Sequence, residues 1–155
     1  HVAVRDILIV PDKMLKRVSR RVDKFDDSTL KLAEDLKDTL YSTTGIGVAA
    51  PQIGVLKRVI YIDLRDDTEP VLLINPKIIA KYGKEDSIEG CLSYPGFEGV
   101  VERPKKVRVN GFNEEGKKVQ YSADGLLCKA SCHEIDHLNG IIFLDKAKKI
   151  YREDS

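Results

Sequence analysis

Two histidines with a glutamate between them are the first feature of this chain that could carry out chemistry. His133 and His137 are four residues apart, so in a helix they lie on one face and can turn both imidazoles toward one cation. Glu134 then lies beside the cation without ligating it, where it can accept a proton from a metal-bound water. The spacing favours a metal centre with a general base over two unrelated surface histidines.

Two histidines leave such a site incomplete, because catalytic zinc-type centres usually have three protein ligands and one open position. The candidates are the three cysteines and several carboxylates. Cys128 and Cys132 fall on the same predicted helix but off its metal-facing side, so we expect them to be small, partly buried side chains. Cys91 comes from a separate segment, and the residues alone leave it open whether it is a thiolate ligand or an inert core cysteine.

A stretch with little side-chain bulk lies at residues 45–52, which read Gly-Ile-Gly-Val-Ala-Ala-Pro-Gln. Its glycines let the backbone approach a ligand closely, and Gln52 adds an amide that can donate and accept. The stretch lacks the lysine of a phosphate-binding loop and does not fit the dinucleotide-binding fingerprint. By itself it is typical of a turn as much as of a ligand contact.

The composition limits the function classes. The net charge is +1, which argues against a broad electrostatic surface for nucleic acid or an anionic membrane. We find no apolar run long enough to span a bilayer and no signal-peptide pattern. Three cysteines cannot form a complete set of disulfides within one chain, which favours a reducing, cytoplasmic location. The length favours one domain, residues 1–155, with a sizeable core.

The N-terminal part predicts an extended segment followed by a helix. Residues 2–10 run into Pro11-Asp12, which is typical of an extended segment that ends in a turn. Residues 25–28 supply cap residues, and the apolar side chains behind them recur at helical spacing up to a break before Gly45. The expected inner face comprises Leu30, Ala33, Leu36 and Leu40, and the expected outer face Lys31, Glu34, Asp35 and Asp38.

The rest of the chain predicts short strands and a final helix. Strands are expected at 58–64, 71–74 and 77–82, and a hairpin at 106–122. A helix should run from Asp124-Gly125 to Gly140, followed by a short strand at 141–144 and a charged tail from Lys146 that frays. The expected fold class is α+β, with short, mostly antiparallel strands around the C-terminal helix and one N-terminal helix.

Three stretches together resemble the peptide deformylase family. The motifs of that family are Gly-x-Gly-x-Ala-Ala-x-Gln, Glu-Gly-Cys-x-Ser, and His-Glu-x-x-His on a C-terminal helix. All three occur here in that order, at residues 45–52, 89–93 and 133–137. The resemblance covers nearly the whole chain. One such motif is weak evidence, whereas three in sequence are highly specific.

The resemblance implies a metal centre and a reaction. Cys91, His133 and His137 would bind one divalent ion, usually iron(II), with zinc, nickel and cobalt as alternatives that the sequence does not distinguish. Glu134 would be the general acid and base: it takes a proton from the metal-bound water, whose hydroxide attacks a formyl carbon, and then protonates the leaving amine. The products would be formate and a free N-terminus.

The resemblance also implies how the substrate is held. The Gln52 amide and the Leu92 backbone N–H would stabilise the charge that develops on the formyl oxygen. The backbone near Ile46 and Gly47 would pair with the formyl-methionine of a nascent chain as an added strand. The other substrate-binding residues would be Gly90, Leu126 and Lys129. Nascent formyl-methionyl polypeptides are thus the expected partners, together with the ribosome at the level of the family. The expected location is the bacterial cytoplasm, or an organelle in a eukaryote.

Two positions depart from the pattern that the resemblance implies. Cys132 stands where a glutamine commonly precedes the first metal histidine, and Lys129 occupies a usually apolar position one turn before His133. We expect Lys129 to lay its methylenes along the pocket for the methionine side chain and to send its ammonium to solvent. Asp136 and Arg103 carry a weaker hypothesis, in which both orient ligand residues by hydrogen bonds rather than lying as solvated surface charges.

Other function classes share part of the pattern. A zinc peptidase also uses His-Glu-x-x-His, but a cysteine ligand supplied from upstream argues against it, and a peptidase should cleave an unformylated peptide. A metal-stabilised binding module would need a fourth protein ligand, which none of the motifs supplies. A family member without activity is disfavoured by the intact Glu134 and Gln52.

Overall fold

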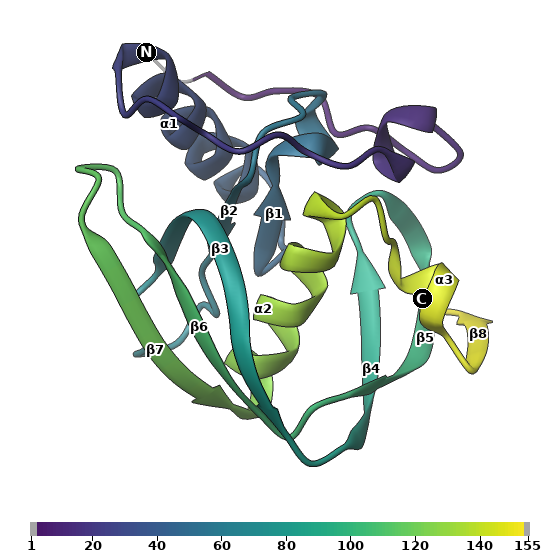
Figure 1. The fold of residues 1–155 in the computed structure, drawn as a ribbon. Helices are drawn as coiled ribbons and strands as arrows, with labels where there is room; N and C mark the ends of the chain where they lie inside the picture. The colour runs from purple at the N-terminus through teal and green to yellow at the C-terminus, as the bar shows by residue number, and fades with distance from the viewer. Residues whose placement is uncertain (1–2, 154–155) are drawn as a thin grey trace.

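Two antiparallel sheets enclose one long helix in the computed structural model, which describes residues 3–153 (Figure 1). The five-stranded sheet has the strand order β1-β2-β3-β6-β7, and the three-stranded sheet the order β4-β5-β8. This arrangement confirms the expected α+β class. The expectations for Val2 and for residues 154 and 155 lie outside the described residues. No helix within residues 3–153 is both long and apolar enough to cross a membrane.

The larger sheet includes the predicted hairpin. Its strands are β1 (Gly47–Ala49), β2 (Val59–Ile62), β3 (Val71–Tyr82), β6 (Lys106–Phe112) and β7 (Lys118–Asp124). The prediction of two separate strands at 71–74 and 77–82 was wrong, because β3 continues through Asn75 with a shift of register. Asn75 adopts a left-handed φ of 52°, and its side chain exchanges two hydrogen bonds with the backbone of Val22. The chain therefore bends there without leaving the sheet.

The smaller sheet comprises β4 (Glu85–Cys91), β5 (Tyr94–Arg103) and β8 (Lys149–Arg152). The charged tail was expected to fray, but its described part forms β8 and pairs antiparallel with β5. The strand expected at 141–144 is also wrong, since this segment leads into a short helix, α3 (Phe143–Lys146). A short apolar run does not distinguish strand from helix, and here the Asp145 carboxylate accepts from the Ile142 N–H and favours the helical turn.

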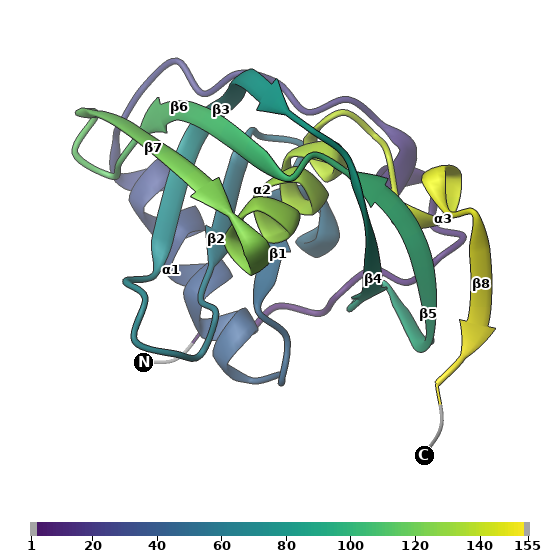
Figure 2. The same cartoon turned by 90° about the horizontal axis from the view of Figure 1, so that it is seen from below.

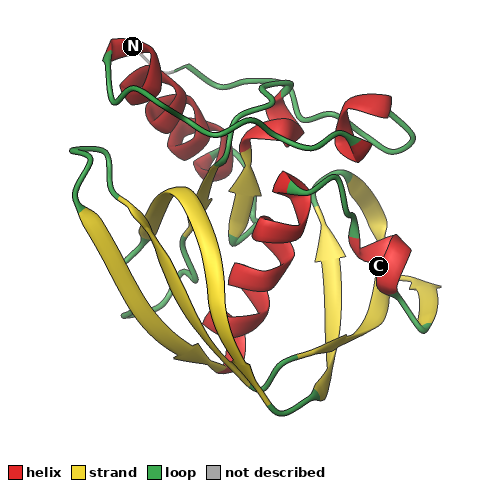
Figure 3. Cartoon of the chain, viewed as in Figure 1, coloured by secondary structure: helices red, strands yellow, loops and turns green. Residues whose placement is uncertain are grey.

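The helix α2 (Gly125–Leu138) lies between the two sheets, as Figures 2 and 3 show from two directions. One side of it packs against the larger sheet, where Cys128, Cys132 and Leu138 join a core with Ile60 and Val109. Burial of this side orients the helix, because residues three and four apart share a face. The remaining face, which carries the histidines, is thereby turned toward β4 and β1.

The helix α1 (Asp27–Tyr41) covers the outer face of β1 and β2. Asp26 caps it by accepting from the Thr29 N–H. Two residues of its predicted faces are exchanged: Leu30 is 40% exposed and Asp35 only 3% exposed. The N-terminal segment runs across this side of the helix, and Arg5 donates to Asp35 at 3.2 Å. Two short 3-10 helices, η1 (Lys13–Lys16) and η2 (Ala50–Ile53), complete the described elements.

Candidate active site

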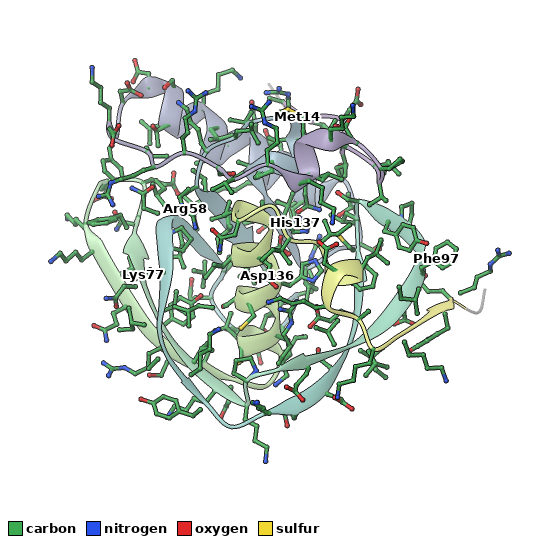
Figure 4. The ribbon with its side chains drawn as sticks, turned by 45° about the vertical axis from the view of Figure 1, so that its right-hand side comes forward. Met14, Arg58, Lys77, Phe97, Asp136 and His137 are labelled. Carbon is green, nitrogen blue, oxygen red and sulfur yellow. The ribbon has the colours of Figure 1, made fainter. Side chains whose placement is uncertain are left out.

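Three potential metal ligands converge from two elements that are distant in sequence. The α2 helix presents His133 and His137, and β4 ends at Cys91. One ligand atom from each residue lies within 4.8 Å of the others, and the Cys91 Sγ is 3.4 Å from the His137 Nε2. Figure 4 labels His137 near the C-terminal end of α2, where its side chain is fully buried. Of the three cysteines, only Cys91 joins this group, whereas Cys128 and Cys132 are buried in the core.

The donor set fits a divalent cation. Two bonds of about 2.3 and 2.1 Å at a tetrahedral angle place sulfur and nitrogen about 3.6 Å apart, close to the separation of Cys91 and His137. Both histidines are buried, and the Nδ1 of His137 has no hydrogen-bond partner among the described residues. Burial, followed by the charge of His133, holds the pKa of His137 well below its ordinary value. His137 is therefore a neutral imidazole, the form that binds metals.

Glu89 orients the first of these histidines. The His133 Nδ1 donates to the Glu89 Oε1 at 2.9 Å, which leaves the Nε2 to face the ligand cluster. Burial alone would raise the pKa of Glu89, but its hydrogen bonds from Arg103 and His133 outweigh burial and lower that pKa to about 2. Glu89 is thus a permanent carboxylate that fixes the tautomer and the ring of a ligand.

A buried arginine, Arg103, binds the Glu89 carboxylate. Arg103 donates to both Glu89 oxygens at 2.8 Å and to the Asp136 Oδ2 at 2.7 Å. Lys146 also pairs with Asp136, 3.1 Å from its Oδ1 and 3.0 Å from its Oδ2. Arg103 and Asp136 are therefore not freely solvated surface charges, but the hydrogen bonds of the structure connect them to His133 only through Glu89. They form an outer layer rather than direct partners of a ligand.

Glu134 lies beside the cluster and outside it. Its side chain is buried, its Oε1 has no hydrogen-bond partner among the described residues, and burial raises its pKa to about 7. The Oε2 lies over Gly47, 2.6 Å from the position that a Cβ of that residue would occupy. A carboxylate that can gain and lose a proton near neutral pH is thus held against the backbone of β1.

The Gln52 amide is held in one orientation by hydrogen bonds at both ends. Its Oε1 accepts from the Ala49 N–H at 2.9 Å, and its Nε2 donates to the Ser93 Oγ at 3.1 Å. The Nε2 is also 3.6 Å from the Cys91 Sγ. The donor end of the amide therefore faces the ligand cluster, next to Leu92, which follows Cys91 in the chain.

A cavity of about 440 Å³ opens onto these groups. It lies between β1 and β4, each of which is the outermost strand of its own sheet. The structure thus brings together every substrate-binding and catalytic residue expected from the sequence at one cavity. His137 does not line the cavity, but its Nε2 lies 3.4 Å from the Sγ of Cys91, which does. The expected residues that line the cavity are Ile46, Gly47, Gln52, Gly90, Cys91, Leu92, Leu126, Lys129, His133 and Glu134.

Lys129 lines the cavity, but the expectation for its ammonium was wrong. The Nζ forms an ion pair with Glu85 and donates to the Pro104 carbonyl at 3.0 Å, and the side chain is only 11% exposed. Glu85 begins β4 and Lys129 lies in α2, so the pair joins two walls of the cavity. The charge is neutralised within the protein, and the methylene groups of Lys129 can still form part of the cavity wall.

Sequence analysis assigned no individual role to two further residues of the site, Glu89 and Ser93, although both lie in the motif at residues 89–93. Glu89 lies two residues before Cys91, so in a strand both side chains share one face; this spacing could have identified it as a neighbour of the cluster. Ser93 has no comparable signal, because its contact with Gln52 joins segments 41 residues apart. The departure at Cys132 is buried in the core, where burial raises the pKa of its thiol to about 12.

Comparisons with known proteins find one family. A family model described as polypeptide deformylase matches residues 4–153. The chain is 48% identical over 147 residues to the peptide deformylase of Alkaliphilus metalliredigens, a match that covers 95% of this chain and 99% of that protein. It is 45% identical over 144 residues to peptide deformylase 1 of Clostridium acetobutylicum, covering 93% and 95% of the two chains.

Solved structures lead to the same family. The crystal structure of a peptide deformylase from Legionella pneumophila matches with a TM-score of 0.91 and 41% identity, over 94% of this chain and 87% of that one. The peptide deformylase from Thermotoga maritima matches with a TM-score of 0.89 and 33% identity, over 94% and 99%.

Proposed function

This chain belongs to the polypeptide deformylase family, and on that premise we propose that Cys91, His133 and His137 hold its metal ion. The activity is that of the family: a metal-dependent hydrolase removes the formyl group from the N-terminal formyl-methionine of newly made polypeptides and releases formate. The donor set of the three residues carries the assignment. We propose Fe(II) as the native ion because it is the usual ion of the family; the donor set of one thiolate and two imidazoles also accepts zinc, nickel or cobalt.

Glu134 is the proton carrier of the proposed mechanism. A divalent ion in this site would act as a Lewis acid on the formyl group and lower the pKa of water. The Glu134 carboxylate takes one proton from that water as the water oxygen bonds to the formyl carbon. The bond from that carbon to the substrate nitrogen then breaks, and Glu134 returns the proton to the leaving nitrogen. The buried position and raised pKa of Glu134 support both roles.

Gln52 and Leu92 stabilise the charge that builds up on the formyl oxygen. The bonds to Ala49 and Ser93 orient the Gln52 amide before substrate arrives, and a donor that needs no reorganisation is worth more in a water-excluded site. The Leu92 backbone N–H is the second donor in this proposal. Its position directly after Cys91, in the lining of the same cavity, supports this role.

The substrate backbone lies between the two edge strands. Gly47 of β1 and Gly90 of β4 line opposite sides of the cavity and have no bulky side chain, so an extended peptide can pair with the sheet edges. The methionine side chain enters the part of the cavity lined by Ile88, Leu126 and the stem of Lys129. Apolar walls suit the methionine side chain, because a flexible, unbranched thioether can fill an irregular apolar space.

The wider setting is also a proposal. Members of this family act on nascent polypeptides, and we place the reaction in the bacterial cytoplasm, with the ribosome as the source of substrate. Support comes from the bacterial relatives that match this chain over almost their full length.

The test is formate release from a formyl-methionyl peptide by protein purified without oxygen and loaded with Fe(II). Glu134→Ala, with its metal content measured, runs beside the parent. Formate from the parent and about 10³-fold less from the metal-loaded variant would support both the reaction and the base. A fully metallated parent that releases no formate would contradict the proposal. An unformylated peptide serves as the control for peptidase activity.

A further inference from the structure

Arg65 holds the loop that leads into β1, here called the entry loop (residues 43–46). Its Nη2 donates to the carbonyls of Thr43 at 3.1 Å and Gly45 at 3.0 Å, and to that of Leu40 at 3.1 Å. The Nε makes a second bond to the Gly45 carbonyl at 3.2 Å. One guanidinium thus joins the end of α1 to the entry loop, although Arg65 does not line the cavity.

Arg65 is itself held in place by its neighbours. Its backbone has a left-handed φ of 62°, and its N–H donates to the Asp63 Oδ1 at 2.8 Å. The guanidinium carbon lies 5.1 Å from the centre of the Tyr41 ring, and the Tyr41 hydroxyl donates to the Asp63 Oδ2 at 2.8 Å. The Tyr41 ring and the bond from the Arg65 N–H to Asp63 hold the side chain over the loop, and a planar guanidinium loses little freedom when it binds several acceptors.

The bond to Gly45 determines which way the next amide points. In a trans peptide the carbonyl and the following N–H point in opposite directions. The Gly45 carbonyl faces Arg65, so the Ile46 N–H points to the other side of the chain, where Ile46 lines the cavity. The Ile46 carbonyl accepts from the Asp63 N–H at 2.8 Å, which fixes the next peptide plane against the end of β2.

We propose that Arg65 is a positioning residue for substrate binding: it orients the Gly45–Ile46 peptide so that the Ile46 N–H is available to the backbone of the formyl peptide. This inference rests on the proposed function, which places substrate along β1. The group that the Ile46 N–H would bind is a peptide carbonyl of the substrate near its formylated residue. Arg65 touches neither substrate nor metal ion, so its effect should fall on substrate affinity and not on the chemical step.

The variants separate the guanidinium from the backbone. Arg65→Gly removes the side chain and accepts the left-handed φ without strain, while Arg65→Lys keeps the charge on a single donor group. Tyr41→Phe is the control, because it keeps the ring beneath the guanidinium and removes only the hydroxyl. All are assayed as metal-loaded protein with a formyl-methionyl tripeptide, and hydrogen–deuterium exchange is followed in the entry loop and in α2.

For Arg65→Gly we expect KM to rise about tenfold with kcat and metal content within about twofold of the parent. Exchange in the entry loop should be about tenfold faster, with α2 unchanged. Arg65→Lys should fall between parent and Arg65→Gly, and Tyr41→Phe should keep KM within about twofold. An unchanged KM, or a loss of kcat in place of the KM change, would overturn the role of Arg65.

The two proposals fail in different ways. A metallated parent without formate release would overturn the proposed function and this role with it. An active parent whose Arg65 variants exchange and bind as the parent does would overturn the role alone. If Arg65→Gly does not fold, Arg65→Lys decides: a KM within about 1.5-fold of the parent contradicts the proposal.

Discussion

Gly47 and Glu134 approach each other so closely that a Cβ on Gly47 would lie 2.6 Å from the Glu134 Oε2. The first comes from the edge strand of one sheet and the second from the helix between the sheets. The absence of a side chain at Gly47 therefore creates the space that the proposed base occupies. The consequence can be tested directly.

Gly47→Ala should lower kcat about 10²-fold while the metal content is retained. The added methyl group pushes the Glu134 carboxylate away from the reacting water, and the three atoms nearest to it all belong to Glu134 and not to the proposed ligands. Steady-state kinetics and metal analysis of the purified variant check this. In a Glu134→Ala background the same substitution should have no further effect on kcat; an equal loss there would show that Gly47 acts by another route.

Glu89→Gln should weaken both the fold and the metal site. The change removes the negative charge and one of the two acceptor oxygens between Arg103 and His133. Because Arg103 keeps its bond to Asp136, the loss of stability should stay below the roughly 3–5 kcal/mol of a buried charge left without any partner. Loss of the bond to the His133 Nδ1 should lower metal affinity about 10–100-fold. Chemical denaturation of the metal-free protein and competition with a chelator measure the two effects separately.

Asp136→Asn should lower metal affinity much less than Glu89→Gln does. Arg103 keeps both bonds to Glu89 in this variant, and Asp136 is connected to His133 only through them. Metal affinity should therefore stay within about threefold of the parent. A loss as large as that of Glu89→Gln would mean that Asp136 orients the metal site more directly than these contacts indicate.

Ser93→Ala should reduce kcat about tenfold with little change in metal content. The variant removes one of the two bonds that orient the Gln52 amide, while the bond to Ala49 remains. Removal of a whole oxyanion donor costs about 10²–10³ in kcat, so loss of its support should cost less. Ser19→Ala is the matched control, since Ser19 is buried and its hydroxyl has no partner among the described residues; its kcat should match the parent.

Lys129→Ala should raise KM for a formyl-methionyl peptide about three- to tenfold, because the methylene stem no longer forms the cavity wall. Lys129→Met retains the stem without the charge and should stay within about twofold of the parent. The pair is compared in the same steady-state assay. If Lys129→Met is as impaired as Lys129→Ala, then the ion pair with Glu85, and not the stem, maintains the pocket.

Several features of this protein follow from short-range sequence alone. The spacing of His133 and His137 places both imidazoles on one face of a helix, because the α-helix repeats every 3.6 residues. The hairpin of β6 and β7 and the cap of α1 at Asp26 depend on residues a few positions apart. The three motifs, taken together, identify the family with no knowledge of how they meet.

Most outcomes that sequence reasoning missed depend on segments that meet from a distance, although the short helix α3 has a local cause in the bond between Asp145 and Ile142. The tail forms β8 because β5 offers it an unpaired edge. Asp35 is buried because the N-terminal segment crosses α1, and the Lys129 ammonium is paired because β4 begins beside it. Local periodicity carries no information about such neighbours, since it reports only the faces of one element.

The sequence by itself therefore determined the chemical groups of the candidate site, and the tertiary structure decided their arrangement. The proposed ligand Cys91 reaches the histidines only because packing of α2 against the larger sheet turns its remaining face toward β4. The same packing brings Glu134 over Gly47 and Glu89 onto His133. Helix and strand spacing act over a few residues, whereas burial of apolar surface sets which elements meet and at what distance.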